Sequence, residues 1–342
     1  MNIIVLAGGI SPEREVSLSS GNLVSKALLK NGHNVLLLDL CQDIDLKVSV
    51  EEYYYNNCNS FYEPSIISKT YNEDNIGNTS ENFIGKNILK LCKFCDIVFL
   101  SLHGSIGENG KLQALFDLNN IKYTGTGYTG SLLAMDKQIT KEILVANKIS
   151  TPRWIFCKLP LYDDSLFKNS NLNFPVVVKP NSCGSSIGVS IANNNFELKE
   201  SIQKAEKLES SIIIEEYIKG REFSIGILSN NTLPIIEIKP VSGFYDYENK
   251  YQHGKTIEVC PAEINKTLAN EIQEIAIRIH ELLKLGYYSR IDFIIDEMNK
   301  VYFLEANTLP GMTPTSLIPQ EAKAVGISYE NLCELIVKHP FK

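Results

Sequence analysis

The chain has 342 residues, of which 44% are hydrophobic and 21% are charged, as in an ordinary soluble globular protein of two or three domains. Its net charge of -7 and pI of about 5.4 argue against nucleic-acid binding, which needs a basic surface. An anionic ligand must therefore be held by a local cluster of cations. No apolar stretch is long enough for a membrane span and no signal segment is recognisable, so we expect a cytoplasmic protein without a membrane partner.

The first part of the chain has the pattern of an α/β unit. Ile3–Ala7 is typical of a short buried strand, and a helix is predicted from Ser11, as N-cap, to about Gly32. Asn34–Leu40 is the next predicted strand, and a β–α–β order favours a parallel sheet. Asp96–Leu102 is predicted to add a strand that ends at His103, at the sheet edge where ligand groups gather.

Residues 41–87 differ from their surroundings, because they are rich in Asn, Tyr and Ser and have weak periodicity. We interpret them as a variable surface insertion that contains one helix. After residue 125 the pattern predicts an α+β organisation. The predicted helices are Asp136–Ala146, Glu197–Leu208 and Leu268–Leu283. The predicted strands are Phe174–Pro180, Ser211–Tyr217, Glu222–Leu228, Pro234–Lys239, Ser289–Asp296 and Val301–Ala306.

The last two strands form a predicted hairpin with polar residues on one face. If Asp296 pairs with Val301, the antiparallel register and the alternation of side chains bring four polar residues together: Arg290, Asp292, Glu305 and Asn307. The apolar residues between them are expected on the opposite face: Ile291, Phe293, Leu304 and Ala306.

Two carboxylates directly opposite each other repel, so the hairpin makes sense if divalent cations lie between them. An all-oxygen set of two carboxylates and one amide suits Mg²⁺, with substrate phosphates completing the coordination. The alternative is a solvated polar face on an edge hairpin. The presence of Arg290 and Asn307 on the same face favours the metal site.

A loop rich in Ser and Gly, residues 181–188, follows Lys179 at the end of a predicted strand. Glycines let backbone amides approach an anion, and serines add donors. An ordinary turn is the alternative, but Lys179 together with Lys137 favours phosphate binding. The Walker A pattern and the GxGxxG fingerprint are both absent, which argues against a P-loop enzyme and a dinucleotide oxidoreductase. Backbone amide and carbonyl groups beside the strand at 211–217 are placed to bind an adenine edge, and Glu222 to bind ribose hydroxyls. The alternative for these acids is a charged strand exit.

Seven motifs in this order closely resemble those of the D-alanine:D-alanine ligases of the ATP-grasp superfamily, over nearly the whole chain except about 41–87. They are Gly8-Gly9 with Glu13-Arg14-Glu15-Val16-Ser17, Leu102-His103-Gly104, Met135-Asp136-Lys137, Lys179-Pro180 with Gly184-Ser185-Ser186-Ile187-Gly188, Tyr245-Asp246-Tyr247-Glu248-Asn249-Lys250-Tyr251, Arg290-Ile291-Asp292, and Glu305-Ala306-Asn307-Thr308-Leu309-Pro310-Gly311-Met312-Thr313.

The resemblance implies an ATP-grasp α/β fold with three domains. An N-terminal parallel α/β domain, 1–125, would precede two α+β domains, 126–215 and 216–342, that sandwich ATP. Residues 242–256 would close over the site as a lid, since an acyl phosphate must be shielded from water.

The resemblance also implies the site residues. ATP would be bound by Lys137, Lys179, Ser186, Glu215, Glu216, Ile218, Glu222 and Lys250. Two Mg²⁺ ions, with Mn²⁺ as a substitute, would be bound by Asp292, Glu305 and Asn307. The two D-alanine subsites would be formed by Glu13, His103, Arg290, Gly311, Ser316 and Leu317. The catalytic residues would be Glu13, Ser185, Tyr251, Arg290 and Gly311. A monovalent cation such as K⁺ is a further candidate cofactor, and a homodimer is the expected assembly.

The implied reaction has two steps, attack of the first carboxylate on the γ-phosphate of ATP and attack of the second amine on the resulting acyl phosphate. The product would supply peptidoglycan precursor synthesis. One rival is a related ligase that makes D-Ala-D-Ser or D-Ala-D-lactate; the intact Lys250-Tyr251 pair argues against the ester-forming enzyme. A non-catalytic nucleotide-binding regulator is the other rival, but it would be expected to have lost Lys179, Asp292 or Glu305.

Overall fold

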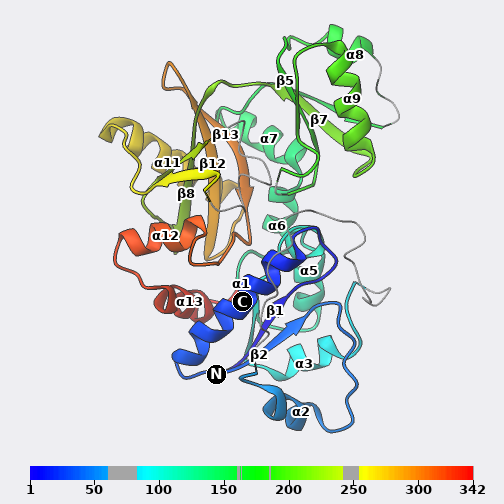
Figure 1. The fold of residues 1–342 in the computed structure, drawn as a ribbon, viewed down its shortest axis with the longest axis vertical. Helices are drawn as coiled ribbons and strands as arrows, with labels where there is room; N and C mark the ends of the chain where they lie inside the picture. The colour runs from blue at the N-terminus through cyan, green and yellow to red at the C-terminus, as the bar shows by residue number, and fades with distance from the viewer. Residues whose placement is uncertain (61–82, 160–161, 163, 185, 242–253, 342) are drawn as a thin grey trace.

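The computed structural model describes the chain except for residues 61–82, 160–161, 163, 185, 242–253 and 342. The described strands form three sheets, one near the N-terminus and two after residue 150. Figure 1 shows the N-terminal sheet at the bottom and the other two sheets above it. Within the described part of the chain, no helix is long and apolar enough to cross a membrane.

The N-terminal sheet is parallel, as predicted, and has the order β2-β1-β3. Alternate residues of β1 face two separate cores: Ile3 and Val5 contact the α1 and α13 side, whereas Ile4 and Leu6 contact the α2, α3 and α5 side. The bounds are β1 Asn2–Ala7, β2 Asn34–Asp39, β3 Ile97–Leu100, α1 Arg14–Lys30, α2 Val50–Asn57, α3 Ile88–Phe94, α4 Ser105–Glu108, α5 Lys111–Leu118 and α13 Tyr329–Lys338.

Two local predictions in this part were wrong. Helix α1 begins at Arg14, after a turn in which the Ser11 hydroxyl accepts a hydrogen bond from the Glu13 N–H at 3.1 Å. The segment 41–87 is not only a surface insertion, since Tyr54 of α2 is fully buried and its hydroxyl lies 3.0 and 2.7 Å from the carbonyl oxygens of Ile3 and Asn34. Residues 61–82 of this segment lie outside the described residues.

The central sheet is antiparallel with the order β4-β7-β5-β6, and α9 covers one of its faces. Its strands are short and carry β-branched residues that are buried in the described core, notably Val176, Val178, Ile212 and Ile214. The bounds are β4 Trp154–Lys158, β5 Val176–Pro180, β6 Ser190–Ala192, β7 Ser211–Glu216, α8 Asp164–Lys168 and α9 Asn195–Glu206.

The third sheet has the order β11-β10-β8-β12-β13, with β9 paired to β8. Its outer face packs against α11, α6 and α7 in one core, so the helices at 128–146 lie on this sheet. The bounds are β8 Gly220–Leu228, β9 Asn231–Thr232, β10 Ile236–Pro240, β11 Thr256–Val259, β12 Tyr288–Asp296, β13 Val301–Asn307, α6 Tyr128–Met135, α7 Lys137–Ala146, α11 Lys266–Leu282 and α12 Leu317–Ala324. The domain boundaries at 125 and 215 stay a prediction.

The hairpin of β12 and β13 forms as predicted, although the pairing next to its turn is shifted by one residue. Val301 pairs with Ile295, and the expected pairing with Asp296 was wrong by one residue. Asp292 nevertheless pairs with Glu305, and the register also brings Arg290 opposite Asn307. The four polar residues therefore share one end of the hairpin.

A β-bulge explains why the Asp292–Glu305 and Arg290–Asn307 pairs form as predicted although the pairing at the turn is shifted by one residue. Phe293 pairs with Phe303 while the preceding pair contains Glu305, so Leu304 has no partner across the ladder. The bulge breaks the strict alternation of β13. Leu304 and Glu305 consequently both line the same cavity, and the prediction that Leu304 faces away from Glu305 was wrong.

Candidate active site

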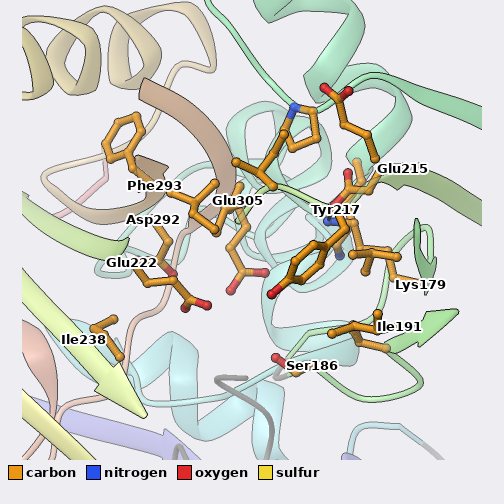
Figure 2. Close-up of a pocket in the computed structure, with 18 of the residues that line it drawn as sticks. Lys179, Ser186, Ile191, Glu215, Tyr217, Glu222, Ile238, Asp292, Phe293 and Glu305 are labelled. Carbon is orange, nitrogen blue, oxygen red and sulfur yellow. Dashed lines mark ion pairs between the residues drawn. The ribbon is translucent and has the colours of Figure 1, made fainter. Parts of the chain in front are cut away.

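A cavity lies between the central and third sheets. Figure 2 shows Lys179, Glu215 and Tyr217 on one side of it, facing the acidic side chains of Glu222, Asp292 and Glu305. Apolar side chains from both sheets complete its walls: Val177, Ile191, Phe223, Ile238, Phe293 and Leu304. A concave, mostly apolar space with a few charged groups at one end is suited to a nucleotide.

The central-sheet wall carries a buried group of three ionised side chains. Glu215 forms an ion pair with Lys179 through one carboxylate oxygen and with Lys141 through the other, at 2.9 Å. Burial alone would raise the pKa of Glu215, but the charges of Lys141 and Lys179 hold it below its ordinary value. Sequence reasoning missed Lys141; the available signal was its position one helical turn after Lys137 on α7.

Two further acids, Glu216 at the end of β7 and Glu222 near the start of β8, have side chains that point to different partners. The Glu216 carboxylate is held by Arg153, with Nη2 at 2.7 Å and the Arg153 N–H at 3.0 Å. Glu216 therefore lines the cavity beside Tyr217 and Ile218 with its carboxylate held by Arg153, and its N–H donates to the Arg153 carbonyl oxygen at 2.9 Å. Glu222 lines the opposite side of the cavity, next to Asp292 and Glu305.

The Ser/Gly loop lies at the mouth of the cavity, where Cys183 and Ser186 line it. Lys137 donates a hydrogen bond from Nζ to the Cys183 carbonyl oxygen at 2.7 Å, so this lysine holds the loop as well as lining the cavity. Burial lowers the pKa of Lys137, and the charge of Glu305 opposes that effect. Ser186 has φ of +58°, a left-handed conformation that turns the chain sharply. Ser185 lies outside the described residues.

On the third-sheet wall, Asp292 is surrounded by donors. Arg290 binds it through Nε at 3.0 Å and Nη2 at 2.8 Å, and Asn307 donates from Nδ2 at 3.0 Å. The Ser224 hydroxyl donates to the other side of the carboxylate at 2.6 Å. Asp292 is thus oriented before any ligand arrives, and Glu305 lies across the hairpin from it. Ser224 is a further residue that sequence reasoning missed.

Three motifs that are far apart in the sequence meet at Glu13. Its side chain is 5% exposed, and a methyl group at Gly104 would lie only 2.8 Å from its Oε2 atom. A methyl group at Gly184, in the Ser/Gly loop, would lie 3.6 Å from the same atom. The absence of side chains at both glycines therefore lets the His103-Gly104 turn and the Ser/Gly loop close around this carboxylate.

His103 is buried beside Glu13. Its Nδ1 atom lies 3.1 Å from the Leu309 carbonyl oxygen and must donate to it, which leaves Nε2 as an acceptor. Burial lowers the pKa of His103 and the charge of Glu13 opposes this, so the ring is neutral at pH 7. Nε2 is buried and has no hydrogen-bond partner among the described residues. An orphaned buried acceptor of this kind is expected to meet a ligand.

Glu108 was not predicted, yet it joins two parts of the site. Its carboxylate accepts hydrogen bonds from the Gly104 N–H at 2.6 Å and from the Leu309 N–H at 3.3 Å. Burial, together with the charges of Glu13 and Glu305, raises the pKa of Glu108 to about 7. The N-terminal loop and the segment after β13 are thereby held together by one side chain.

The predicted second subsite lies at the start of α12. The Ser316 hydroxyl accepts from the Thr313 N–H at 3.1 Å and does not cap α12. A methyl group at Gly311 would lie 2.8 Å from this hydroxyl, so the Gly311 backbone and Ser316 are close. The first N–H groups of α12, beginning at Leu317, are therefore not capped by this side chain.

The lid is mostly outside the described residues, because the structure describes only its last residues, 254–256. Lys250 and Tyr251 belong to the part that is not described. Apart from Ser185, Lys250 and Tyr251, the site residues predicted from the sequence lie in or beside the cavity, around Glu13 or near the start of α12.

An N-terminal parallel sheet followed by two antiparallel sheets that enclose a cavity for a nucleotide defines the class of ATP-grasp enzymes. Family models for the N-terminus and the C-terminus of D-ala D-ala ligase match residues 2–126 and 162–338. A D-alanine--D-alanine ligase of Pediococcus pentosaceus is 44% identical over 98% of this chain and 97% of its own length. One from Lacticaseibacillus casei is 39% identical over 100% of this chain and 96% of its own.

Solved structures agree with these relatives. A D-alanine--D-alanine ligase from Bacillus anthracis complexed with ATP has a TM-score of 0.76 at 30% identity, covering 99% of this chain and 97% of its own. The VanG D-Ala:D-Ser ligase from Enterococcus faecalis has a TM-score of 0.76 at 27% identity, covering 99% of both chains. The chain belongs to the D-alanine--D-alanine ligase family of ATP-grasp enzymes.

Proposed function

We propose that this protein joins two D-alanine molecules into D-alanyl-D-alanine at the expense of ATP, through an acyl phosphate, as a step of peptidoglycan precursor synthesis. The observation that carries the proposal is the meeting of Glu13, the His103-Gly104 turn and the Ser/Gly loop at one point. That point is close to Glu305, because the charges of Glu13 and Glu305 both raise the pKa of the Glu108 carboxyl group. Full-length similarity to D-alanine--D-alanine ligases supports the choice of substrate.

ATP is proposed to lie between the two sheets, with its base between the apolar walls. Lys137, Lys179 and the loop around Ser186 would bind the phosphates. The adenine edge would be bound by Glu215 and by backbone groups from Glu216 to Ile218. Glu222, and Lys250 from the lid, would complete the nucleotide site.

Two Mg²⁺ ions are proposed at the hairpin, bound by Asp292, Glu305 and Asn307. These residues fit the metal because they offer oxygen ligands beside the residues proposed to bind the phosphates. Asp292 is already oriented by hydrogen bonds from Arg290 and Ser224. When bound, the ions would neutralise the charge of the transferring phosphoryl group. Mn²⁺ as a substitute and K⁺ as a further cation belong to this proposal.

The first D-alanine is proposed to place its ammonium on Glu13, in a closed site where a charge pair is strong. The neutral Nε2 of His103 would accept a further hydrogen bond there. The carboxylate of this D-alanine would then face the γ-phosphate. Ser185 and Tyr251 are proposed to connect this subsite to the lid.

The second D-alanine is proposed to bind its carboxylate at Ser316 and Leu317, where the N–H groups of α12 are not capped by the Ser316 side chain. Its free amine would attack the acyl carbon, form the peptide bond and expel phosphate as the C–O bond of the acyl phosphate breaks. Arg290 and the Gly311 N–H would stabilise the oxyanion that forms. Arg290 suits this role because two of its donors are fixed on Asp292, which holds the guanidinium in place.

A related ligase that makes D-Ala-D-Ser is the second candidate, since the VanG ligase has the same fold. Release of ADP, measured with D-Ala, L-Ala, D-Ser and D-lactate as second substrates, separates the candidates. We expect D-Ala to be used best. Preferential use of D-Ser or D-lactate would replace the proposed function by that of the related ligase, and no ADP release with any of them would reject both.

We also propose a cytoplasmic homodimer, on the basis of the family resemblance. Light scattering coupled to size-exclusion chromatography measures the mass directly. A mass of one chain, 38.3 kDa, at micromolar concentration would contradict the dimer.

A further inference from the structure

Lys141 is a buried lysine that lies behind the nucleotide cavity rather than in its lining. Its side chain is 2% exposed, and its Nζ atom lies 2.9 Å from Glu215 Oε2, 2.7 Å from Thr151 Oγ1 and 2.9 Å from the Pro152 carbonyl oxygen. The Thr151 and Pro152 oxygens accept hydrogen bonds from the ammonium group, and the Glu215 carboxylate pairs with it by charge. The Nζ atom also lies 4.9 Å from the centre of the Trp154 ring.

Lys179 faces the cavity from the other side of Glu215. Each oxygen of the Glu215 carboxylate is paired with one lysine, Oε1 with Lys179 and Oε2 with Lys141. The group of three therefore carries two positive charges and one negative charge, and its positive end at Lys179 lines the cavity. Without Lys141, Glu215 and Lys179 would form a neutral pair, and a phosphate would have to compete with a buried carboxylate for Lys179.

The geometry points to a role that no motif of the sequence indicated. We propose that Lys141 is a positioning residue for nucleotide binding, which neutralises Glu215 from behind and thereby leaves the charge of Lys179 available to the phosphates of ATP. The inference rests on the proposed function, because it takes Lys179 to be a phosphate ligand. Burial lowers the pKa of Lys141 to about 8, so the ammonium is still mostly charged at pH 7.

Lys141 is also fixed with respect to both walls of the cavity. The Thr151 hydroxyl, which accepts from Lys141, donates to the Phe303 carbonyl oxygen at 3.1 Å, and the Phe303 N–H donates to the Ser150 carbonyl oxygen at 2.9 Å. Phe303 lies on β13, two residues before Glu305. The counter-charge for Glu215 is therefore held by the segment that joins the central sheet to the metal hairpin.

The test is the Lys141→Met substitution in the full chain, with the affinity for ADP and Mg²⁺ measured by calorimetry and the KM for ATP by ADP release. Loss of one member of a buried charge group predicts about 10- to 100-fold weaker nucleotide binding. The KM for D-alanine and kcat are expected to change by less than about 3-fold, because the substituted group does not touch the transferring phosphoryl group. Unchanged nucleotide affinity would overturn the proposal.

A double-substitution cycle with Glu215→Gln separates charge compensation from packing. Once Glu215 carries no charge, Lys141 has nothing to neutralise, so Lys141→Met in the Glu215→Gln background should change nucleotide affinity by less than about 3-fold. A packing role predicts the same loss in both backgrounds and would overturn the proposal. This half of the cycle decides the question even if the Lys141→Met chain does not fold.

Thr151→Val is the matched control, since it removes one hydrogen bond of Lys141 and keeps its charge. We expect less than about 3-fold weaker nucleotide binding for it, against about 10-fold or more for Lys141→Met. An equal loss in both would mean that the hydrogen bonds, and not the charge, matter. Lys179→Met tests the foundation separately: if it binds nucleotide normally, the phosphate role of Lys179 in the proposed function fails, whereas a failure confined to Lys141→Met rejects only this inference.

Discussion

The two walls of the cavity carry opposite net charges. On the central sheet, Lys141 and Lys179 flank the single carboxylate of Glu215, which makes that group positive. On the third sheet, Arg290 pairs with Asp292, and Glu305 lies opposite Asp292 across the hairpin, so these three side chains carry a net negative charge. One wall is therefore suited to phosphates and the other to metal ions, and a metal-bound nucleotide would complement both at once. Both sheets are therefore needed to bind such a nucleotide.

The largest expected effect comes from weakening the negative wall at Glu305. Glu305→Gln keeps the side-chain volume but removes one of two proposed metal carboxylates, so we expect at least about 10³-fold lower kcat. ADP release measures this, and the melting temperature should stay normal. Asp296→Asn, at the turn of the same hairpin, is the control and should keep its activity. Near-normal turnover of Glu305→Gln would remove the metal role of this wall.

Glu108, beside the negative wall, should make stability depend on pH. Its folded-state pKa of about 7 lies above its ordinary value of 4.5, so the folded state holds the proton more tightly than the unfolded state. The resulting stabilisation is complete below pH 4.5 and is lost as the pH rises through 7. It amounts to at most about 3 kcal/mol.

We therefore expect Glu108→Gln to flatten the decline in the free energy of unfolding between these pH values, as measured by urea denaturation. Glu200→Gln, at an exposed position of α9, is the control and should retain the wild-type dependence. Parallel curves for Glu108→Gln and the wild type would contradict the raised pKa.

A substitution at Glu13 tests whether the two cavity walls are sufficient for the reaction or whether a separate D-alanine subsite is needed. Glu13→Gln removes a buried negative charge, and we expect the KM for the first D-alanine to rise about 30- to 100-fold while the KM for ATP stays the same. Substrate-dependence of ADP release at saturating ATP gives both constants. Glu15→Gln, which affects a carboxylate paired with Arg14 on the same helix, should change neither. An unchanged KM for D-alanine would reject the ammonium role of Glu13.

The smallest effect is expected where the orientation of the negative wall is loosened without a change in charge. Ser224→Ala removes one of the hydrogen bonds to Asp292, and the loss of one donor to a charged group predicts about 5- to 10-fold lower kcat. The apparent affinity for Mg²⁺ should fall in parallel. A lower kcat with unchanged Mg²⁺ dependence would show that Ser224 acts on folding and not on the metal site.

The strands, most helices and the polar pairs of the hairpin could be predicted, because their periodicity is local. The pairing of Asp292 with Glu305 was predicted correctly from an incorrect turn, since the bulge at Leu304 compensated for a shift of one residue. The residue types of β13 do not by themselves show where the bulge lies. The burial of α2 against the N-terminal sheet was missed because Tyr54 is its single buried residue, and one residue gives no periodicity.

The roles of Lys141, Glu108 and Ser224 were missed for a different reason. Each acts through partners that are distant in the sequence: Lys141 through Glu215, Glu108 through Leu309, and Ser224 through Asp292. A buried charge is stable only if its partners surround it, and those partners are brought together by the packing of whole elements. The residue type alone suggests a solvated side chain in all three cases.

By itself, the sequence determined the alternation of strands and helices, the family motifs and the residue types that suit phosphate, metal and ammonium. These are properties of neighbouring residues and of hydrophobic periodicity, which do not depend on the path of the chain. The tertiary structure alone decided which charges face each other, that Glu216 turns to Arg153, and that Lys141 lies behind Glu215. Electrostatic pairing depends on distance in space and on burial, and both exist only once the sheets have packed together.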